Sequence, residues 1–176
     1  MRLGSRLHFN LVSILTAALI FFICPFNFAE IEEGQKAPDF SLQNLQGKTV
    51  GLTDFKGKIV LLDFWATWCL PCRKSLPELA ELEKKYRDKG VVFLGLSIDD
   101  PDSYDNQYVA EFKDKYKVEY EILRAHSKVV ADYLGTEDVR IPAFLILDKE
   151  GIVVKKHMGF EQGMVEKVLL KLISAQ

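Results

Sequence analysis

The chain has 176 residues, of which 48% are hydrophobic and 27% are charged. These proportions are ordinary for a globular domain with a full core, and they argue against a largely disordered chain. The formal net charge is −2 at pH 7, without a basic block, so nucleic acid is not expected as a partner.

The N-terminal segment has the pattern of an export signal. Arg2 and Arg6 precede an uncharged, mostly apolar stretch over residues 11–29, and acidic residues follow it at once. This order of positive, apolar and acidic regions predicts that the rest of the chain is exported to the outer side of the cytoplasmic membrane.

Two fates of this segment stay open. Ala29 suits the position before a signal-peptidase cut, whereas residues 9–29, about 20 residues, are long enough to span a bilayer as an uncleaved anchor. We therefore expect residues 1–29 to be a signal peptide or membrane anchor, and residues 30–176 to form one domain.

The exported part alternates strand and helix patterns in the order β-hairpin, β, α, β, α, β, α, β, β, α. The order predicts an α/β fold with a central mixed sheet and helices on both faces, in which crossovers give parallel pairs and a late hairpin adds antiparallel strands. The hairpin is expected within residues 34–57, strands over 58–66, 91–98, 118–123 and on both sides of a turn at 149–151, and helices from Cys72 to Gly90 and over 103–117, 127–134 and 162–174.

Cys69 and Cys72 form a C-x-x-C pair directly after the apolar strand 58–66. With Cys24 in the N-terminal segment, they are the two cysteines of the exported domain, and they are expected to pair in an oxidising compartment. The pair is a structural staple, part of a metal site, or a redox couple.

The first two interpretations have weak support. A disulfide that spans two residues closes a very small loop, so it stabilises the fold less than a bond between distant segments. A structural zinc site needs four ligands, and the exported domain offers only His126 and His157, in separate elements, beside the two cysteines. A copper-handling protein with one of these histidines as third ligand remains an alternative.

The redox interpretation has a mechanism. Cys69 falls where a strand ends and a helix begins, where free backbone N–H groups and the helix dipole favour a thiolate. Arg73 and Lys74 add positive charge nearby, and Pro71 suits the first helical turn. Cys72, one turn further, is placed to attack a mixed disulfide on Cys69 and release the reduced partner.

These motifs resemble the thioredoxin superfamily over about residues 34–174. The segment DFWATWCLPC matches its W-C-x-P-C element, and Pro77 matches the proline inside its active-site helix. The segment RIPAFLILDKEG is similar to its cis-proline loop, which makes Pro142 the expected cis-proline. The resemblance implies that the backbone of Ile141 pairs with the substrate polypeptide, beside a contact surface that includes Trp68 and Pro71.

Within the superfamily the chain is most similar to the TlpA/ResA-like branch of exported thiol–disulfide oxidoreductases. The lead-in APDFSLQNLQGKTVGLTDFKGK and the extra segment around residues 101–123 carry this similarity. It implies protein disulfide substrates, among them apocytochrome c before haem attachment, and a membrane electron donor that recharges the dithiol. No metal and no cofactor are expected.

Asp63 is a lone acid within the predicted central strand, where burial is costly and raises a carboxyl pKa. Thioredoxins carry an Asp at the matching position as proton acceptor for the second cysteine. Many TlpA/ResA-like proteins instead have Asn there and an acid three residues after that cysteine, where this chain has Ser75. The resemblance therefore implies that Asp63 relays the proton of Cys72; a purely structural Asp is the alternative.

The two tryptophans receive different interpretations. Trp65 is expected to pack in the core, and Trp68, directly before Cys69, is expected to shape the contact surface for a partner.

Peroxidase chemistry is a further alternative, because peroxiredoxins share the fold. That chemistry requires Thr or Ser three residues before the reactive Cys and Pro seven residues before it, where this chain has Ala66 and Leu62. The sequence thus favours an exported disulfide reductant, with a copper chaperone and a peroxidase as alternatives.

Overall fold

The computed structural model describes residues 30–175; the N-terminal segment that was interpreted as a signal or anchor lies outside the described residues. The strands are β1 (Ser41–Gln43), β2 (Thr49–Gly51), β3 (Ile59–Trp65), β4 (Val91–Ser97), β5 (Glu121–Arg124), β6 (Ala143–Leu147) and β7 (Val153–Met158). The α-helices are α2 (Leu70–Tyr86), α3 (Asn106–Lys115), α4 (Ser127–Leu134) and α5 (Met164–Ser174), with short 3₁₀ turns at Leu52–Phe55 and Arg87–Lys89.

Within the described part, the main sheet has five strands in the order β5-β4-β3-β6-β7. β3 pairs in parallel with β4, and β4 with β5, whereas β6 is antiparallel to both β3 and β7. The central strand β3 is buried at every position, which explains why all its residues except Asp63 are apolar. The mixed sheet, the N-terminal hairpin β1–β2 and the inserted α3–β5 segment confirm the predicted fold.

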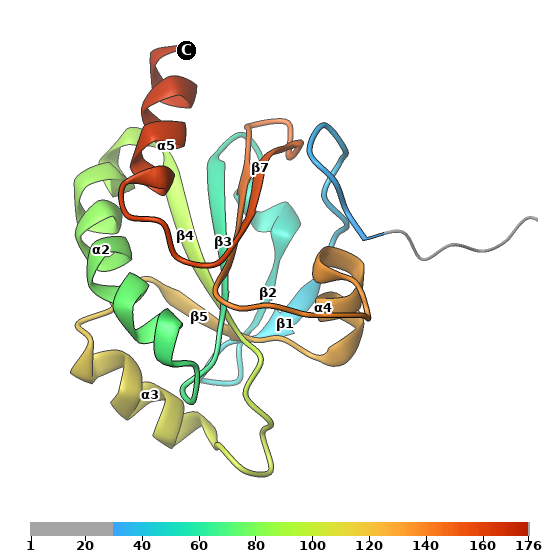
Figure 1. The fold of residues 1–176 in the computed structure, drawn as a ribbon, viewed down its shortest axis with the longest axis vertical. Helices are drawn as coiled ribbons and strands as arrows, with labels where there is room; N and C mark the ends of the chain where they lie inside the picture. Colours follow the sequence, from blue (N-terminus) through green and yellow to red (C-terminus); the bar gives the residue numbers. More distant parts are fainter. Residues whose placement is uncertain (1–29, 176) are drawn as a thin grey trace, which may run out of the picture.

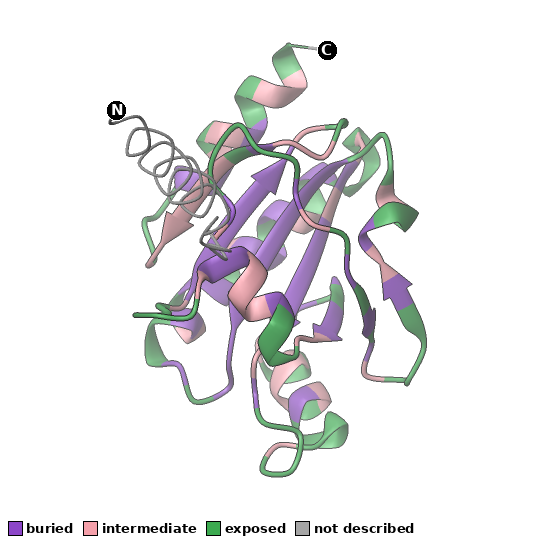
Figure 2. Ribbon diagram, turned by 90° about the vertical axis from the view of Figure 1, so that its right-hand side faces the viewer, coloured by how far each residue is buried: buried purple, intermediate pink, exposed green. Residues whose placement is uncertain are grey.

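The two faces of the sheet bury separate sets of side chains. Ile59, Leu61 and Trp65 of β3 lie on one face with residues of α2, α3 and α5, and we call this the α2 face. The alternate residues of β3 lie on the other face with α4 and the hairpin, and we call this the α4 face. Figure 1 shows α2 and α3 on one side of the sheet and α4 on the other, and Figure 2 shows the buried central strands between the helices.

Helix α2 begins at the carboxyl end of β3, with Cys69 as its N-cap and Pro71 in its first turn. Pro77 lies inside the helix, where its lack of an N–H removes one backbone hydrogen bond. The helix ends at Tyr86 rather than at Gly90. A 3₁₀ turn follows, and Gly90 ends that turn with a left-handed φ of 76°, a conformation that glycine adopts without a Cβ penalty.

Within residues 30–175, no helix is both long and apolar enough to cross a bilayer.

Candidate active site

Cys69 and Cys72 are joined by a disulfide at the N-terminus of α2. Cys69 Sγ accepts a hydrogen bond from the backbone N–H of Cys72, with 3.2 Å between N and Sγ. Cys69 is 5% exposed and lies at the surface groove described below, whereas Cys72 is fully buried. The cap position and this N–H donor stabilise negative charge on Cys69 Sγ when the bond is reduced.

The loop before β6 faces the disulfide. Its Ile141–Pro142 peptide bond is cis, as the resemblance predicted. The carbonyl oxygen of Ile141 lies 3.6 Å from Cys69 Sγ, and Pro142 is buried while Ile141 is partly exposed. The backbone edge of this loop therefore borders the accessible sulfur.

A groove with apolar walls opens beside Cys69. Trp68 and Leu70, on either side of the cysteine in the chain, are 53% and 65% exposed. The other lining residues come from the start of α2, from the cis-proline loop and from the end of β7: Pro71, Val139, Arg140, Ile141, Met158 and Gly159. Exposed apolar side chains gathered at one place are typical of a surface that binds a partner.

Trp65 instead packs in the core. Its ring stacks on Phe112 of α3, with centroids 5.5 Å apart, and its side chain is buried. The two tryptophans thus have the environments that the sequence predicted for them.

Asp63 lies in the middle of β3 and is 1% exposed. It lies two residues from Leu61 and two from Trp65, and residues two apart in a strand point to the same face. Asp63 therefore points to the α2 face, whose core cluster includes Cys72. Tyr120 donates a hydrogen bond to Asp63 Oδ2 at 3.1 Å, and Oδ1 has no hydrogen-bond partner among the described residues. Burial raises the pKa of Asp63 from its ordinary 3.8 to about 7, although the bond from Tyr120 acts in the opposite direction.

Ser75, at the position where the resemblance implied an acid in many relatives, is buried and donates its hydroxyl to the carbonyl of Cys72 at 2.9 Å. This hydroxyl is a neutral group tied to the helix backbone. Asp63 is a buried acid on the α2 face, and its role as the proton acceptor of Cys72 stays a prediction.

The sequence did not reveal how the loop before Cys69 is held. Thr67 donates its backbone N–H to both carboxylate oxygens of Asp99, at 3.0 and 3.1 Å, and its hydroxyl to Oδ1 at 2.7 Å. Arg73 donates two hydrogen bonds to the carbonyl of Thr67, at 2.7 and 3.1 Å, and its guanidinium stacks over Phe112. Asp99 thus holds the backbone N–H of Thr67 and Arg73 holds its carbonyl, and we call these three residues the Thr67 clamp.

The Thr67 clamp extends to the inserted segment. Ser97 donates its hydroxyl to Asp99 Oδ2 at 2.9 Å, and Arg124 of β5 donates to the carbonyls of Asp99 and Tyr104. One sequence feature could have indicated that Asp99 lies near the loop before Cys69. Asp99 follows a buried strand that is parallel to β3, and the carboxyl ends of parallel neighbours meet at the same edge of a sheet.

The two histidines of the copper alternative lie in different places. His126 is the N-cap of α4, and His157 lies on the edge strand β7, near Glu161. Within residues 30–175 no three His, Cys, Asp or Glu side chains are grouped as a metal site would require.

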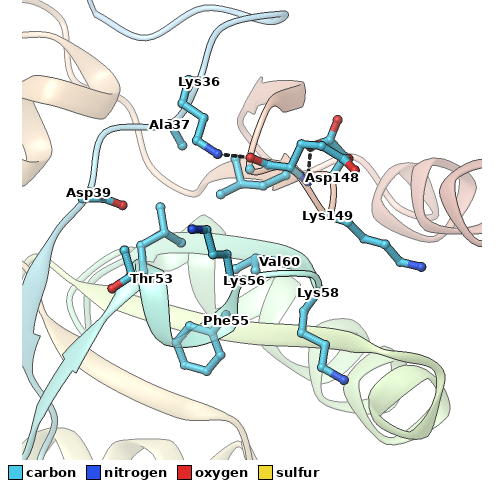
Figure 3. Close-up of a pocket in the computed structure, with 14 residues that line it drawn as sticks. Lys36, Ala37, Asp39, Thr53, Phe55, Lys56, Lys58, Val60, Asp148 and Lys149 are labelled. Atoms are coloured by element: carbon cyan, nitrogen blue, oxygen red, sulfur yellow. Dashed lines mark hydrogen bonds between the residues drawn. The ribbon is translucent and has the colours of Figure 1, made fainter.

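A second hollow, of about 230 Å³, lies at the opposite end of β3 from the disulfide (Figure 3). Lys36 crosses it and donates to the carbonyl of Glu150, while Asp148 accepts backbone N–H groups that close the β6–β7 turn. Lys58 borders this hollow directly before β3, whereas Cys69 follows the end of that strand. The hollow is therefore separate from the redox site.

A C-x-x-C disulfide at a strand-to-helix junction, opposite a cis-proline loop on a mixed five-stranded sheet, defines a thiol–disulfide oxidoreductase of the thioredoxin fold. Comparison with known proteins agrees with this class. Residues 33–156 match the AhpC/TSA family, and the chain belongs to that family.

Its relatives carry the same type of name. The chain is 41% identical over 129 residues to the thioredoxin-like protein YneN of Bacillus subtilis, covering 73% of each chain. It is 33% identical over 175 residues to the thiol-disulfide oxidoreductase ResA of Bacillus cereus, covering 93% of this chain and 97% of that protein. A thiol:disulfide interchange protein from Bacteroides sp. has a similar structure, with a TM-score of 0.70, 28% identity, and coverage of 82% of this chain and 91% of that one.

Proposed function

We propose that this oxidoreductase acts outside the cytoplasm as a reductant of protein disulfides. The observation that carries the proposal is the asymmetry of the pair: Cys69 borders an apolar groove and receives an N–H donor, whereas Cys72 is fully buried. An attacking thiolate at the surface and a protected resolving thiol are what stepwise disulfide exchange requires.

In the proposed cycle, the Cys69 thiolate attacks one sulfur of a client disulfide. A bond forms between Cys69 Sγ and that sulfur, and the other client sulfur leaves as a thiolate and takes up a proton. The Cys72 thiol then gives its proton to Asp63, and its sulfur attacks Cys69 Sγ. The enzyme disulfide forms, the second client thiolate leaves, and two electrons have passed from enzyme to client.

We propose that the groove beside Cys69 binds the client polypeptide. An extended client segment lies along the cis-proline loop, where the backbone of Ile141 pairs with it and Pro142 fixes the loop. Trp68 and Pro71 contact the client residues next to its cysteine. The position of the Ile141 carbonyl 3.6 Å from Cys69 Sγ supports this alignment, because the client sulfur must reach the same point.

The place of action rests on the N-terminal pattern, with residues 1–29 as a signal peptide or anchor and residues 30–176 as the exported domain. A dithiol in an oxidising compartment is consumed at each turnover, so a membrane thiol–disulfide electron donor must restore it. We propose apocytochrome c, which needs reduced cysteines for haem attachment, as the first client to test.

The equilibrium redox potential of the Cys69/Cys72 pair tests the direction. It is measured by alkylation and mass shift in thiol buffers. A value near that of thioredoxin, about −270 mV, is expected for a reductant, and a value near about −120 mV would make the protein an oxidant. Rapid turnover of hydrogen peroxide, or stoichiometric retention of copper by the reduced protein, would favour the alternatives instead.

The relay role of Asp63 has its own test. Reduced protein is mixed with dithiobis-nitrobenzoate, whose two coloured thiolates leave one after the other. The first release reports the attack by Cys69 and the second reports resolution by Cys72. Asp63→Asn should slow the second release about 100-fold near neutral pH and leave the first within a small factor. An unchanged second phase would remove Asp63 from the mechanism.

A further inference from the structure

Tyr120 is distant from Asp63 in the sequence, and its side chain passes over a glycine of the sheet to contact Asp63. It lies in the inserted segment, just before β5, and its hydroxyl bonds to Asp63 two strands away. The strand between them presents Gly95, which is paired with Asp63 on one side and Ile122 on the other. A Cβ on Gly95 would lie 3.2 Å from Tyr120 Cε2 and 2.4 Å from Ile122 Cδ1.

Because glycine has no side chain, the Tyr120 ring can lie over position 95 and extend to the central strand. The ring is also packed against Phe93, with centroids 6.0 Å apart, and the whole side chain is buried. A phenol hydroxyl fixed in this way can donate to one oxygen only, and it donates to Oδ2 of Asp63.

The surroundings of the carboxyl make this bond important. Asp63 lies between Gly95 on β4 and Phe144 on β6, neither of which carries a charge. Cys72 of α2 and Tyr120 belong to the core cluster of this face, as does Tyr86 at the last position of α2, and Glu83 of α2 adds a negative charge that raises the pKa of Tyr120. Within the described residues, Tyr120 is the one hydrogen-bond donor to the side chain of Asp63.

We propose that Tyr120 is a positioning residue for the proton relay: it holds Oδ2 of Asp63, so that Oδ1 is the atom that takes the proton of Cys72. The inference rests on the proposed relay and deepens it. In the step concerned, the S–H bond of Cys72 breaks, an O–H bond forms at Oδ1, and the Cys72 sulfur attacks the mixed disulfide, expelling the client thiolate with its electron pair.

The bond also sets the pH at which the relay operates. The pKa of Tyr120 lies well above its ordinary 10, because its hydroxyl is buried beside a carboxylate, so the hydroxyl stays protonated and remains a donor. A donor stabilises the carboxylate form and lowers the pKa of Asp63, which burial alone would raise further. Without the donor, fewer Asp63 side chains are ionised near neutral pH and able to accept a proton.

Tyr120→Phe tests this inference through the pH profile of the second thiolate release, from about pH 5 to about pH 9. The midpoint should move to higher pH, so the second phase slows about threefold to tenfold near pH 7 and recovers at the alkaline end. The first phase should not change. The matched control is Tyr133→Phe on the α4 face, which also loses a buried hydroxyl, one that donates to the Pro38 carbonyl. Its pH profile should match that of the unsubstituted protein.

The outcomes separate this inference from the relay itself. If Asp63→Asn slows the second phase but Tyr120→Phe leaves its midpoint in place, Tyr120 has no positioning role and the relay stands. If Asp63→Asn has no effect, both fall. Should Tyr120→Phe fail to fold, 3-fluorotyrosine at position 120 keeps the ring and strengthens the donor, and the midpoint should then move to lower pH; an unmoved midpoint would overturn the inference.

Discussion

Two buried carboxylates, one in β3 and one just after the neighbouring strand β4, differ in the number of hydrogen bonds that they accept. Asp99 follows β4, is 2% exposed, and accepts the Thr67 N–H and the hydroxyls of Thr67 and Ser97. Asp63 in β3 is 1% exposed and accepts one bond, from Tyr120. Similar burial therefore accompanies very different hydrogen bonding.

The difference in hydrogen bonding decides how well the charged form of each acid is stabilised. A buried carboxylate with several donors is stabilised in its charged form and fixes the groups that donate to it, which here are in the loop before Cys69. A buried carboxylate with one donor is poorly stabilised when charged, and its pKa moves toward neutrality, where protons are exchanged readily. Substitutions at the two positions should therefore have opposite effects on stability.

The largest effect is expected for Asp63→Asn in the oxidised protein. Because the pKa of Asp63 is raised from 3.8 to about 7, its contribution is most favourable below about pH 4 and is lost as pH rises through 7. That shift corresponds to roughly 4 kcal/mol as an upper estimate. Asn carries no charge, so the variant should be the more stable protein at pH 8, with little difference at pH 4. Urea unfolding at both pH values measures this, and a difference that does not depend on pH would contradict it.

Asp99→Asn should instead destabilise the fold, by about 3 kcal/mol, because an amide nitrogen replaces one acceptor and leaves buried donors without partners. The matched control is Asp100→Asn, the next residue, which removes the same charge from an exposed side chain and should cost less than about 1 kcal/mol. Equal losses for the two variants, measured by urea unfolding, would show that Asp99 is no more structural than its neighbour.

The smallest effect is expected at the other side of the Thr67 clamp. Arg73→Met removes two hydrogen bonds to the Thr67 carbonyl and should cost about 1 kcal/mol. It should also change the rate of the first thiolate release, because the loop before Cys69 loses one of its supports. Lys74→Met is the control: it removes the same charge from an exposed side chain at the next position. If both variants change the first phase equally, charge near Cys69 matters and the clamp does not.

Much of the fold could be predicted because its signals are local. The apolar run at 58–66 and the apolar residues at helical spacing after Cys72 are patterns within short segments, and the structure places β3 and α2 there. The end of α2 could not be predicted to the residue. Gly90 is a strong stop signal, yet a 3₁₀ turn precedes it, since the last turn of a helix often tightens in this way.

The sequence by itself determined the C-x-x-C pair at a strand-to-helix junction and the burial of Asp63, because both follow from residues that are close together in the chain. The resemblance to the thioredoxin superfamily predicted the cis-proline. Only the tertiary structure decided the partners of the two acids. Tyr120 is 57 residues from Asp63, and Thr67 is 32 residues from Asp99. A hydrogen bond depends on the direction and distance between two groups, and for residues so far apart these are fixed only when the strands and helices pack. Burial could thus be predicted from neighbours in the sequence, whereas the hydrogen bonds that a buried acid accepts depend on neighbours in space.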